Sequence, residues 1–127
     1  DNAHACHPNY QAKHEFQHRP SMNNGPVIKV NSSQRYSTDA EGTAVVQLIA
    51  AKRSVPVQEF VPQQAGPCGT TIGPITAGQT CIRTVDIGNA QLSMHSIREV
   101  SGAKDVLHMV NLVQGFLEEF CNFQVPN

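Results

Sequence analysis

The first ten residues of the chain, DNAHACHPNY, gather several side chains that can take part in chemistry. Asp1, His4, Cys6 and His7 fall within seven positions, so a carboxylate, two imidazoles and a thiol lie close together in the sequence. These are side chains by which proteins hold divalent metal ions. Because the chain begins on this stretch without an initiator methionine, we expect it to be a piece of a longer protein.

Two kinds of metal site are compatible with this stretch. A structural zinc site would use Cys6 with some of the histidines His4, His7, His14 and His18. That hypothesis is weak, because no second cysteine stands at zinc-finger spacing. A catalytic site would combine one or two of these residues with ligands from elsewhere and keep one position open for water. Loop histidines without any ligand are the most common case, so that alternative stays open.

His95 is a second candidate, far from the first ten residues. It follows a predicted strand and turn, and α/β proteins place their binding sites at such ends of a sheet. Arg98 and Glu99 either support His95 or form a surface ion pair of small energetic value. A lone loop histidine usually has no function, so the residues alone leave the role of His95 open.

Lys29 stands alone among the aliphatic residues of a predicted strand over 27–30. Alternation along a half-exposed strand favours a lysine that points to solvent, and a cation aimed into a pocket is the alternative. Tyr36, in the following loop, either covers the edge of the core or offers its hydroxyl to a ligand.

Hydrophobic periodicity predicts strands over 27–30, 57–61 and 81–87, of which the last is the clearest. It predicts helices over 39–52, 74–78 and 103–121, and a single helical turn near 14–18. Thr38 and Ser101 are the predicted N-caps of the first and last helices. Strands that alternate with helices indicate an α/β fold with helices on both faces of a sheet.

The apolar positions of two helices predict which faces are buried. In the first helix the predicted stripe is Val45, Leu48 and Ile49. In the last helix the predicted face, which should pack on a sheet, is Val106, Met109, Val110, Val113, Phe116, Leu117 and Phe120.

The bulk properties exclude several classes of function. The 127 residues suffice for one domain, and a net charge of −1 offers no basic excess for nucleic acid. No apolar run approaches the roughly 20 residues of a membrane span. The four cysteines show no C-x-x-C pair, so we expect free thiols in a reducing compartment. Cys81 and Cys121 are expected to be small buried hydrophobes.

Blocks of residues along nearly the whole chain resemble the aspartyl aminopeptidase family. The blocks are DNAHACHPNY at 1–10, KHE at 13–15, HRP at 18–20, GPVIKVN at 25–31, QRY at 34–36, PCGTTIGP at 67–74 and MHSIRE at 94–99. They occur in order and without evident gaps, so the resemblance is specific. This family of dinuclear zinc exopeptidases includes aminopeptidase I, and it removes N-terminal Asp or Glu from peptides.

The resemblance implies that residues 1–127 are the C-terminal portion of the catalytic domain. Its fold would be part of a three-layer α/β/α sandwich with a mixed sheet, an incomplete α/β domain that lacks the family's dimerisation domain. The complete protein would be a homo-oligomer, a dodecamer in the family, with two zinc ions in each active site. It would be located in the cytoplasm rather than the vacuole.

The resemblance also implies roles for individual residues. Asp1 and His95 would be zinc ligands, and His4, Lys29 and Tyr36 would contact the substrate. Lys29 would pair with the substrate's acidic side chain, which reverses the expectation from the residues alone. The loop 69–73 would border the pocket.

The family's remaining ligands and its general-base glutamate lie upstream of the residues that Asp1 matches. We therefore expect this chain alone to bind zinc weakly and to have no peptidase activity. The competing hypothesis is a non-catalytic binding or antigenic module with at most a structural zinc site.

Overall fold

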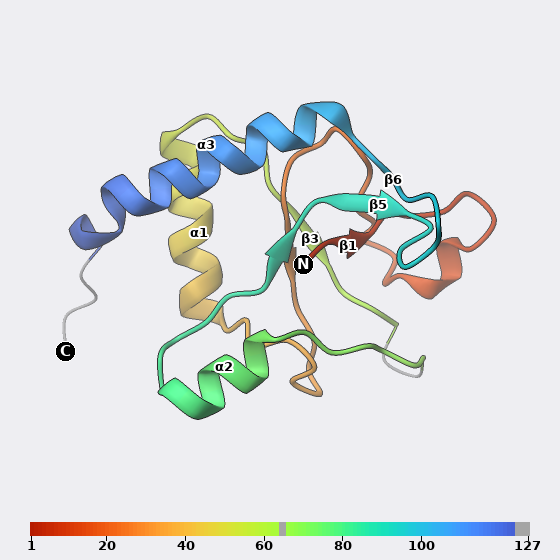
Figure 1. Ribbon diagram of the computed structural model, residues 1–127, viewed down its shortest axis with the longest axis horizontal. Coiled ribbons are helices and arrows are strands. Elements are labelled where there is room, and N and C mark those ends of the chain that lie inside the picture. The colour runs from red at the N-terminus through yellow and green to blue at the C-terminus, as the bar shows by residue number, and fades with distance from the viewer. Residues whose placement is uncertain (64–65, 124–127) are drawn as a thin grey trace.

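The computed structural model describes residues 1–63 and 66–123, and it has three α-helices within those ranges (Figure 1). They are α1 (Ala40–Lys52), α2 (Gly73–Thr80) and α3 (Ala103–Glu119), and short 3-10 turns lie at Gln11–Lys13 and Phe120–Asn122. The strands are β1 (Ala3–His4), β2 (Val27–Lys29), β3 (Gln58–Phe60), β4 (Ile87–Gly88), β5 (Ala90–Leu92) and β6 (Val100–Ser101). No helix of the described part is long and apolar enough to cross a membrane.

Two small mixed sheets organise the chain. In one, β2 is central and runs parallel to β3 and antiparallel to β4. In the other, β5 is central and runs parallel to β1 and antiparallel to β6. The prediction of an α/β fold with mixed strand directions is therefore confirmed.

Strand β2 connects the two apolar clusters of the core. Successive side chains of a strand point to opposite faces, so Val27 and Ile28 enter different clusters, and both are fully buried. Lys29 lies on the same face as Val27 and is only 3% exposed. The expectation of a solvent-facing lysine is wrong, because β2 has no exposed face.

The N-cap of helix α1 is one residue later than predicted. Asp39 is the N-cap, and its side chain accepts a hydrogen bond from Gly42 N at 2.7 Å. Thr38 instead accepts a hydrogen bond from Asp86 N through its hydroxyl at 2.9 Å. The predicted stripe is partly wrong: Ile49 is buried, but Leu48 is 55% exposed.

Helix α3 presents its most apolar face to solvent within the described structure. Its N-cap is Gly102, because the predicted cap Ser101 belongs to β6. Met109 is half-buried, and the other six predicted core residues are exposed, from 40% for Phe116 to 74% for Leu117. Figure 1 shows that α3 crosses the C-terminal half of α1. It packs there through another face, because a Cβ atom on Gly115 would meet Ile49 and Arg53. The predicted packing of this apolar face on a sheet is therefore wrong.

Asp105, in the first turn of α3, ties this helix to the segment that leads into β2. Its fully buried carboxylate accepts hydrogen bonds from Asn23 N at 2.6 Å and Gly25 N at 2.8 Å. Charge-assisted hydrogen bonds of this kind are stronger than neutral ones. They help to set the position of β2, and with it that of Lys29.

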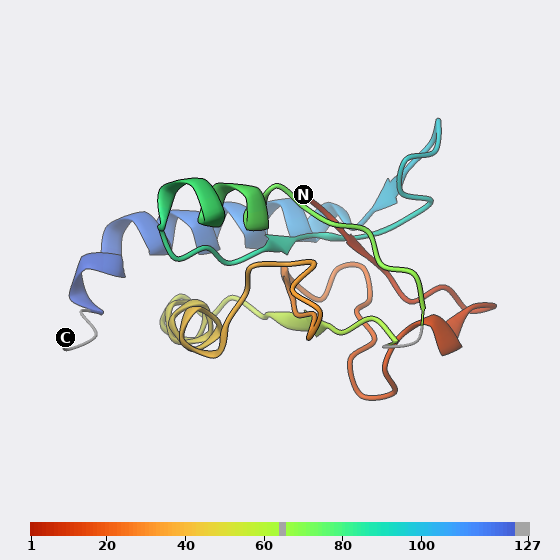
Figure 2. The ribbon, with the colours of Figure 1, turned by 90° about the horizontal axis from the view of Figure 1, so that it is seen from below.

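The predicted strand over 81–87 is largely wrong. Cys81 ends α2 in the left-handed conformation (φ 56°), and residues 82–86 are irregular. Only Ile87 and Gly88 pair with β2. Figure 2 shows this segment passing from α2 toward β5.

Two other local predictions fail as well. The helical turn expected near 14–18 is replaced by the 3-10 turn at Gln11–Lys13. All four cysteines are free, as predicted, but Cys81 and Cys121 are exposed rather than buried. The strands expected over 27–30 and 57–61 are confirmed as β2 and β3.

Candidate functional site

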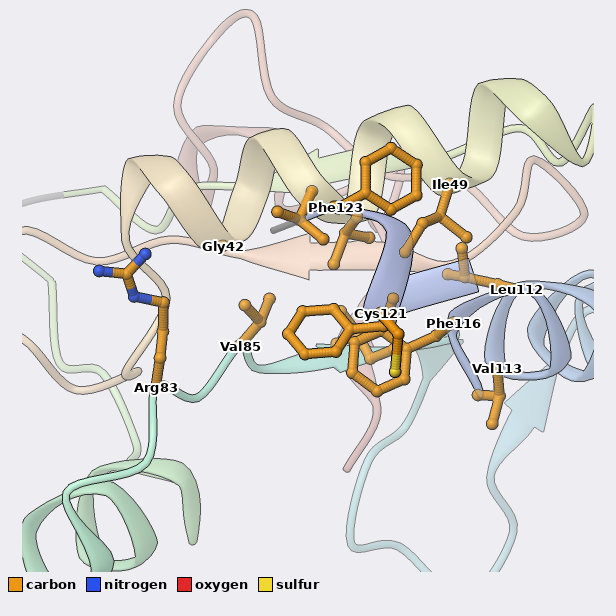
Figure 3. Close-up of a pocket in the computed structure, with 13 residues that line it drawn as sticks. Gly42, Ile49, Arg83, Val85, Leu112, Val113, Phe116, Cys121 and Phe123 are labelled. Atoms are coloured by element: carbon orange, nitrogen blue, oxygen red, sulfur yellow. The ribbon is translucent and has the colours of Figure 1, made fainter. Parts of the chain in front are cut away.

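The described structure has two hollows of different chemical character. The larger one, about 1090 Å³, lies between α1, the segment 83–87 and the C-terminal half of α3 (Figure 3). Its walls are almost entirely apolar, with side chains such as Ile49, Leu112 and Phe116. Arg83 is the one charged side chain on its described wall, so this hollow lacks the groups that catalysis needs.

The smaller cavity, about 390 Å³, contains the candidate chemistry. Its walls come from β1, β2, the loop after β2, the loop 67–71 and the turn after β5. Five residues predicted to form the site all line it: Asp1, His4, Lys29, Tyr36 and His95. Residues 69–71 of the expected loop 69–73 also line it, whereas Ile72 and Gly73 are not part of its described wall.

Pairing of β1 with β5 brings the first residues of the chain next to the segment that leads to His95. Ala3 is opposite Ala90 and His4 is opposite Gln91 in a parallel register. Asn2 Nδ2 strengthens this contact by donating to Gln91 Oε1 at 2.7 Å. Residues separated by about ninety positions thereby meet at one edge of the cavity.

Lys29 is anchored beside Asp1. Its ammonium donates to Asp1 Oδ2 at 3.0 Å, to the Asn2 carbonyl at 2.9 Å and to the Asp1 carbonyl at 3.3 Å. It also lies 5.1 Å from the centre of the Tyr36 ring, within range of a cation–π interaction. Burial lowers the pKa of Lys29, and the nearby Asp86 and Cys68 oppose that effect.

Tyr36 lines the cavity next to Lys29. Its ring packs in the buried cluster with Phe60, and the Cys68 thiol donates to its hydroxyl oxygen at 3.4 Å. Burial, followed by the hydrogen bond with Cys68, raises the pKa of Tyr36. The phenol therefore stays neutral at physiological pH and can donate a hydrogen bond.

His4 faces a cavity wall with a positive electrostatic character. Partial burial lowers its pKa, and the charges of His14, His95 and Lys29 lower it further. His14 supports the same wall, because its Nε2 donates to the His4 carbonyl at 3.1 Å. The described wall has two lysines, Lys13 and Lys29, and one carboxylate, Asp1, and this balance favours an anionic ligand.

His95 lies in the turn after β5 with a left-handed backbone (φ 67°). Such a conformation is uncommon outside glycine, and it clusters at functional sites. The turn is closed by Glu99, whose Oε1 accepts a hydrogen bond from His95 N at 2.5 Å. Glu99 thus supports the backbone of His95, whereas the sequence predicted either side-chain support or a surface ion pair.

The other residues considered for a structural zinc site are spread apart. His7 stacks on Tyr10 with 5.0 Å between ring centres, and His18 pairs with Glu15 at 2.5 Å. Across residues 1–63 and 66–123, no group of three or more His, Cys, Asp or Glu side chains could hold a metal ion.

Asp1 and His95 nevertheless fit a shared metal centre by their chemistry. Both line the cavity, and carboxylate oxygen and imidazole nitrogen are donors that zinc accepts. Asp1 is also the only acidic side chain among the described residues of the wall. By themselves, these two donors are fewer than the protein ligands of a catalytic zinc site.

Sequence reasoning gave Cys68 and Gln91 no part in the cavity and considered His14 only as a candidate metal ligand, whereas all three line the cavity. Cys68 and His14 fall within the blocks on which the resemblance rests, which was the available signal for them. Gln91 carried no signal, because its place in the wall depends on the pairing of β5 with β1.

Comparisons with known proteins show what this chain is similar to. A family model described as aminopeptidase I zinc metalloprotease (M18) matches residues 1–117. The aspartyl aminopeptidase of Dictyostelium discoideum is 51% identical over 125 residues, which are 98% of this chain and 26% of that protein. Aspartyl aminopeptidase 4 of Saccharomyces cerevisiae is 48% identical over 124 residues, which are 98% of this chain and 25% of that protein.

Solved structures show the same relationship. The cryo-EM structure of the Ape4 and Nbr1 complex matches with a TM-score of 0.95 and 44% identity, over 100% of this chain and 25% of that chain. The S. cerevisiae mApe1 dodecamer matches with a TM-score of 0.84 and 37% identity, over 96% of this chain and 26% of that chain. The chain spans about a quarter of the length of these relatives. It belongs to the family of the aminopeptidase I zinc metalloproteases.

Proposed function

We propose that this chain is the C-terminal portion of the catalytic domain of an aminopeptidase that removes N-terminal Asp or Glu from peptides. The observation that supports this proposal is the convergence of Asp1, His4, Lys29, Tyr36 and His95 on one cavity. Three other facts agree with it: the family match, the aspartyl aminopeptidase relatives and the quarter of their length that the chain covers.

In this proposal Asp1 and His95 each hold one of two zinc ions. When bound, the metal would polarise the scissile carbonyl and lower the pKa of the attacking water. Lys29 holds the backbone carbonyls of Asp1 and Asn2 on one side of the cavity, and Glu99 holds the backbone of His95 on the other. Both donors are therefore positioned by the chain's own hydrogen bonds.

Recognition of an acidic substrate is assigned to Lys29, His4 and Tyr36. In the described structure the Lys29 ammonium contacts a carboxylate oxygen of Asp1 at 3.0 Å, and in this proposal the substrate carboxylate would take the place of that oxygen when Asp1 binds the metal. Desolvation in the cavity strengthens a charge-assisted hydrogen bond relative to water. Neutral His4 and Tyr36 can orient the substrate by hydrogen bonds without adding a competing charge.

The 127-residue chain by itself is proposed to be inactive. It supplies two metal donors, and its single cavity carboxylate cannot be both a ligand and the general base. The remaining groups would come from the part of the relatives that this chain does not match, as would a separate dimerisation domain. The same part would cover the exposed apolar face of α3. The complete protein is proposed to act in the cytoplasm as a homo-oligomer, since a related structure is a dodecamer.

The test uses the complete protein and compares Lys29→Met with Lys29→Arg. We expect Lys29→Met to lower kcat/KM for aspartyl and glutamyl substrates more than about thirtyfold, because a buried charge partner is lost. An alanyl substrate should change much less, and Lys29→Arg should retain part of the acidic preference. Zinc content and melting temperature, measured alongside, separate recognition from damage to the site.

Two results would contradict the proposal. One is a complete protein without zinc-dependent aminopeptidase activity. The other is a wild-type enzyme that does not prefer acidic over neutral N-terminal residues.

A further inference from the structure

The hydroxyl of Thr71 is buried in the cavity wall without a partner. Thr71 is 6% exposed and lines the same cavity as Lys29 and Tyr36. Its Oγ1 reaches no hydrogen-bond partner in the described part of the chain. A buried hydroxyl without a hydrogen-bond partner destabilises the fold, so this position is informative about what the cavity binds.

The neighbouring threonine shows that the loop itself does not require the Thr71 hydroxyl. Thr70 Oγ1 donates to the Arg35 carbonyl at 3.0 Å, and the Cys68 thiol donates to Tyr36 Oη at 3.4 Å. These two bonds hold the loop against the segment 35–36. The loop is therefore positioned by Thr70 and Cys68, and the hydroxyl of Thr71 remains available to a ligand.

The surroundings decide the direction of the hydrogen bond. A hydroxyl can donate or accept, but the described wall that Thr71 shares has two lysines, Lys13 and Lys29, and one carboxylate, Asp1, so it favours an anion. The acid of this wall, Asp1, is already engaged by Lys29. The ligand atom that suits Thr71 is therefore an anionic oxygen, to which the hydroxyl donates.

We propose that the Thr71 hydroxyl donates a hydrogen bond to the side-chain carboxylate of the substrate's N-terminal acidic residue and helps to determine specificity. This inference rests on the proposed function. It adds a neutral donor to the cation Lys29 in the recognition of one carboxylate. A site that hydrogen-bonds a substrate group discriminates strongly against substrates that lack it.

The experiment compares Thr71→Val, Thr71→Ser and the matched control Thr70→Val in the complete protein. Thr71→Val removes the hydroxyl at nearly constant shape. We expect it to raise KM for aspartyl and glutamyl substrates about tenfold, with little effect on an alanyl substrate. Because an unpaired buried hydroxyl is lost, the melting temperature should stay equal or rise. Thr71→Ser keeps a hydroxyl, so its KM for the acidic substrates should stay close to the wild-type value.

Thr70→Val should show the opposite pattern. It breaks the bond to the Arg35 carbonyl, so its melting temperature should fall, and any kinetic loss should be the same for acidic and neutral substrates. A Thr71→Val enzyme with an unchanged KM for acidic substrates would overturn the inference. So would an equal loss on the alanyl substrate, or a clear fall in melting temperature.

The wild-type profile separates this inference from the function on which it rests. A wild-type enzyme without acidic preference refutes both. A wild-type enzyme with acidic preference that Thr71→Val leaves intact refutes the role of Thr71 alone.

Discussion

At the scale of single residues, the candidate site depends on close backbone contacts as much as on polar side chains. A Cβ atom on Gly88 would lie 2.0 Å from the Asp1 carbonyl oxygen and 2.6 Å from Asn2 Cα. Lys29 binds the carbonyl oxygens of the same two residues. The position of Asp1 therefore depends on a residue without a side chain, Gly88 in β4, and on the buried cation Lys29 in β2.

Gly88→Ala is predicted to disturb Asp1 and to destabilise the fold by about 1–3 kcal/mol or more, because the new methyl group meets backbone. Urea unfolding of the 127-residue chain measures this cost. Gly78→Ala is the matched control, because a Cβ atom at Gly78 in α2 meets nothing within 4 Å. Alanine there should be neutral or stabilising. Equal stabilities of the two variants would refute the close approach of β1 to Gly88.

At the scale of elements, the contact between α1 and α3 is reinforced by an ionic cluster. Arg53 Nε donates to Glu119 Oε1 at 2.6 Å, and Lys52 lies 2.5 Å from Glu119 Oε2. Arg53 also pairs with Glu118. Glu119 is only 7% exposed, so its ion pairs should contribute more to stability than those of the exposed Glu118. These cations compensate for two glutamates at the negative end of the α3 dipole.

Glu119→Gln is predicted to destabilise the chain at pH 7, and the cost should shrink in acid. The hydrogen bond from Lys52, and then that from Arg53, lower the pKa of Glu119 below its ordinary 4.5. A carboxyl whose folded pKa is depressed stabilises the fold above its unfolded pKa, and it loses that contribution as the pH falls through the folded pKa. The two proteins should therefore converge below pH 4.5.

Urea unfolding between pH 7 and pH 3 tests this expectation, and Glu118→Gln provides the comparison with an exposed neighbour. A difference between wild type and Glu119→Gln that is constant over the whole range would show that the charge of Glu119 has no part in the contact.

At the scale of the whole molecule, the main difference from a domain that buries its own apolar surface is the exposed apolar face of α3. Val106, Val110 and Leu117 are each more than half exposed on this face. Close to them lies the apolar hollow of about 1090 Å³ (Figure 3). Contiguous exposed apolar surface of this kind marks an interface or promotes aggregation.

The 127-residue chain is therefore predicted to self-associate, and Val110→Glu should reduce that association. Sedimentation velocity over a concentration series measures it. Leu48→Glu is the control, because Leu48 is 55% exposed on α1 and does not line the hollow. In the complete protein, Val110→Glu should instead lower the melting temperature, because the face would be covered there. A monomeric wild-type chain at all concentrations would contradict this prediction.

The sequence by itself predicted the α/β class, the strands β2 and β3, the approximate span of the three helices and the candidate residues that the structure brings to one cavity. Local periodicity carries the first three of these, and the resemblance of short blocks carries the last. Tertiary structure decided which side of each element is covered. Lys29 is buried because β2 has two covered faces, and the apolar face of α3 is exposed because α3 meets α1 through its other side.

Caps and hydrogen-bond partners also depended on the tertiary structure. Asp39 rather than Thr38 caps α1, since the Thr38 hydroxyl is engaged by Asp86 N from a distant segment. The unpaired state of the Thr71 hydroxyl is a tertiary fact too, because Thr70 and Thr71 are indistinguishable in the sequence. The types of the residues indicate which chemistry is available, and the packing decides which polar groups remain without a partner and can bind a ligand.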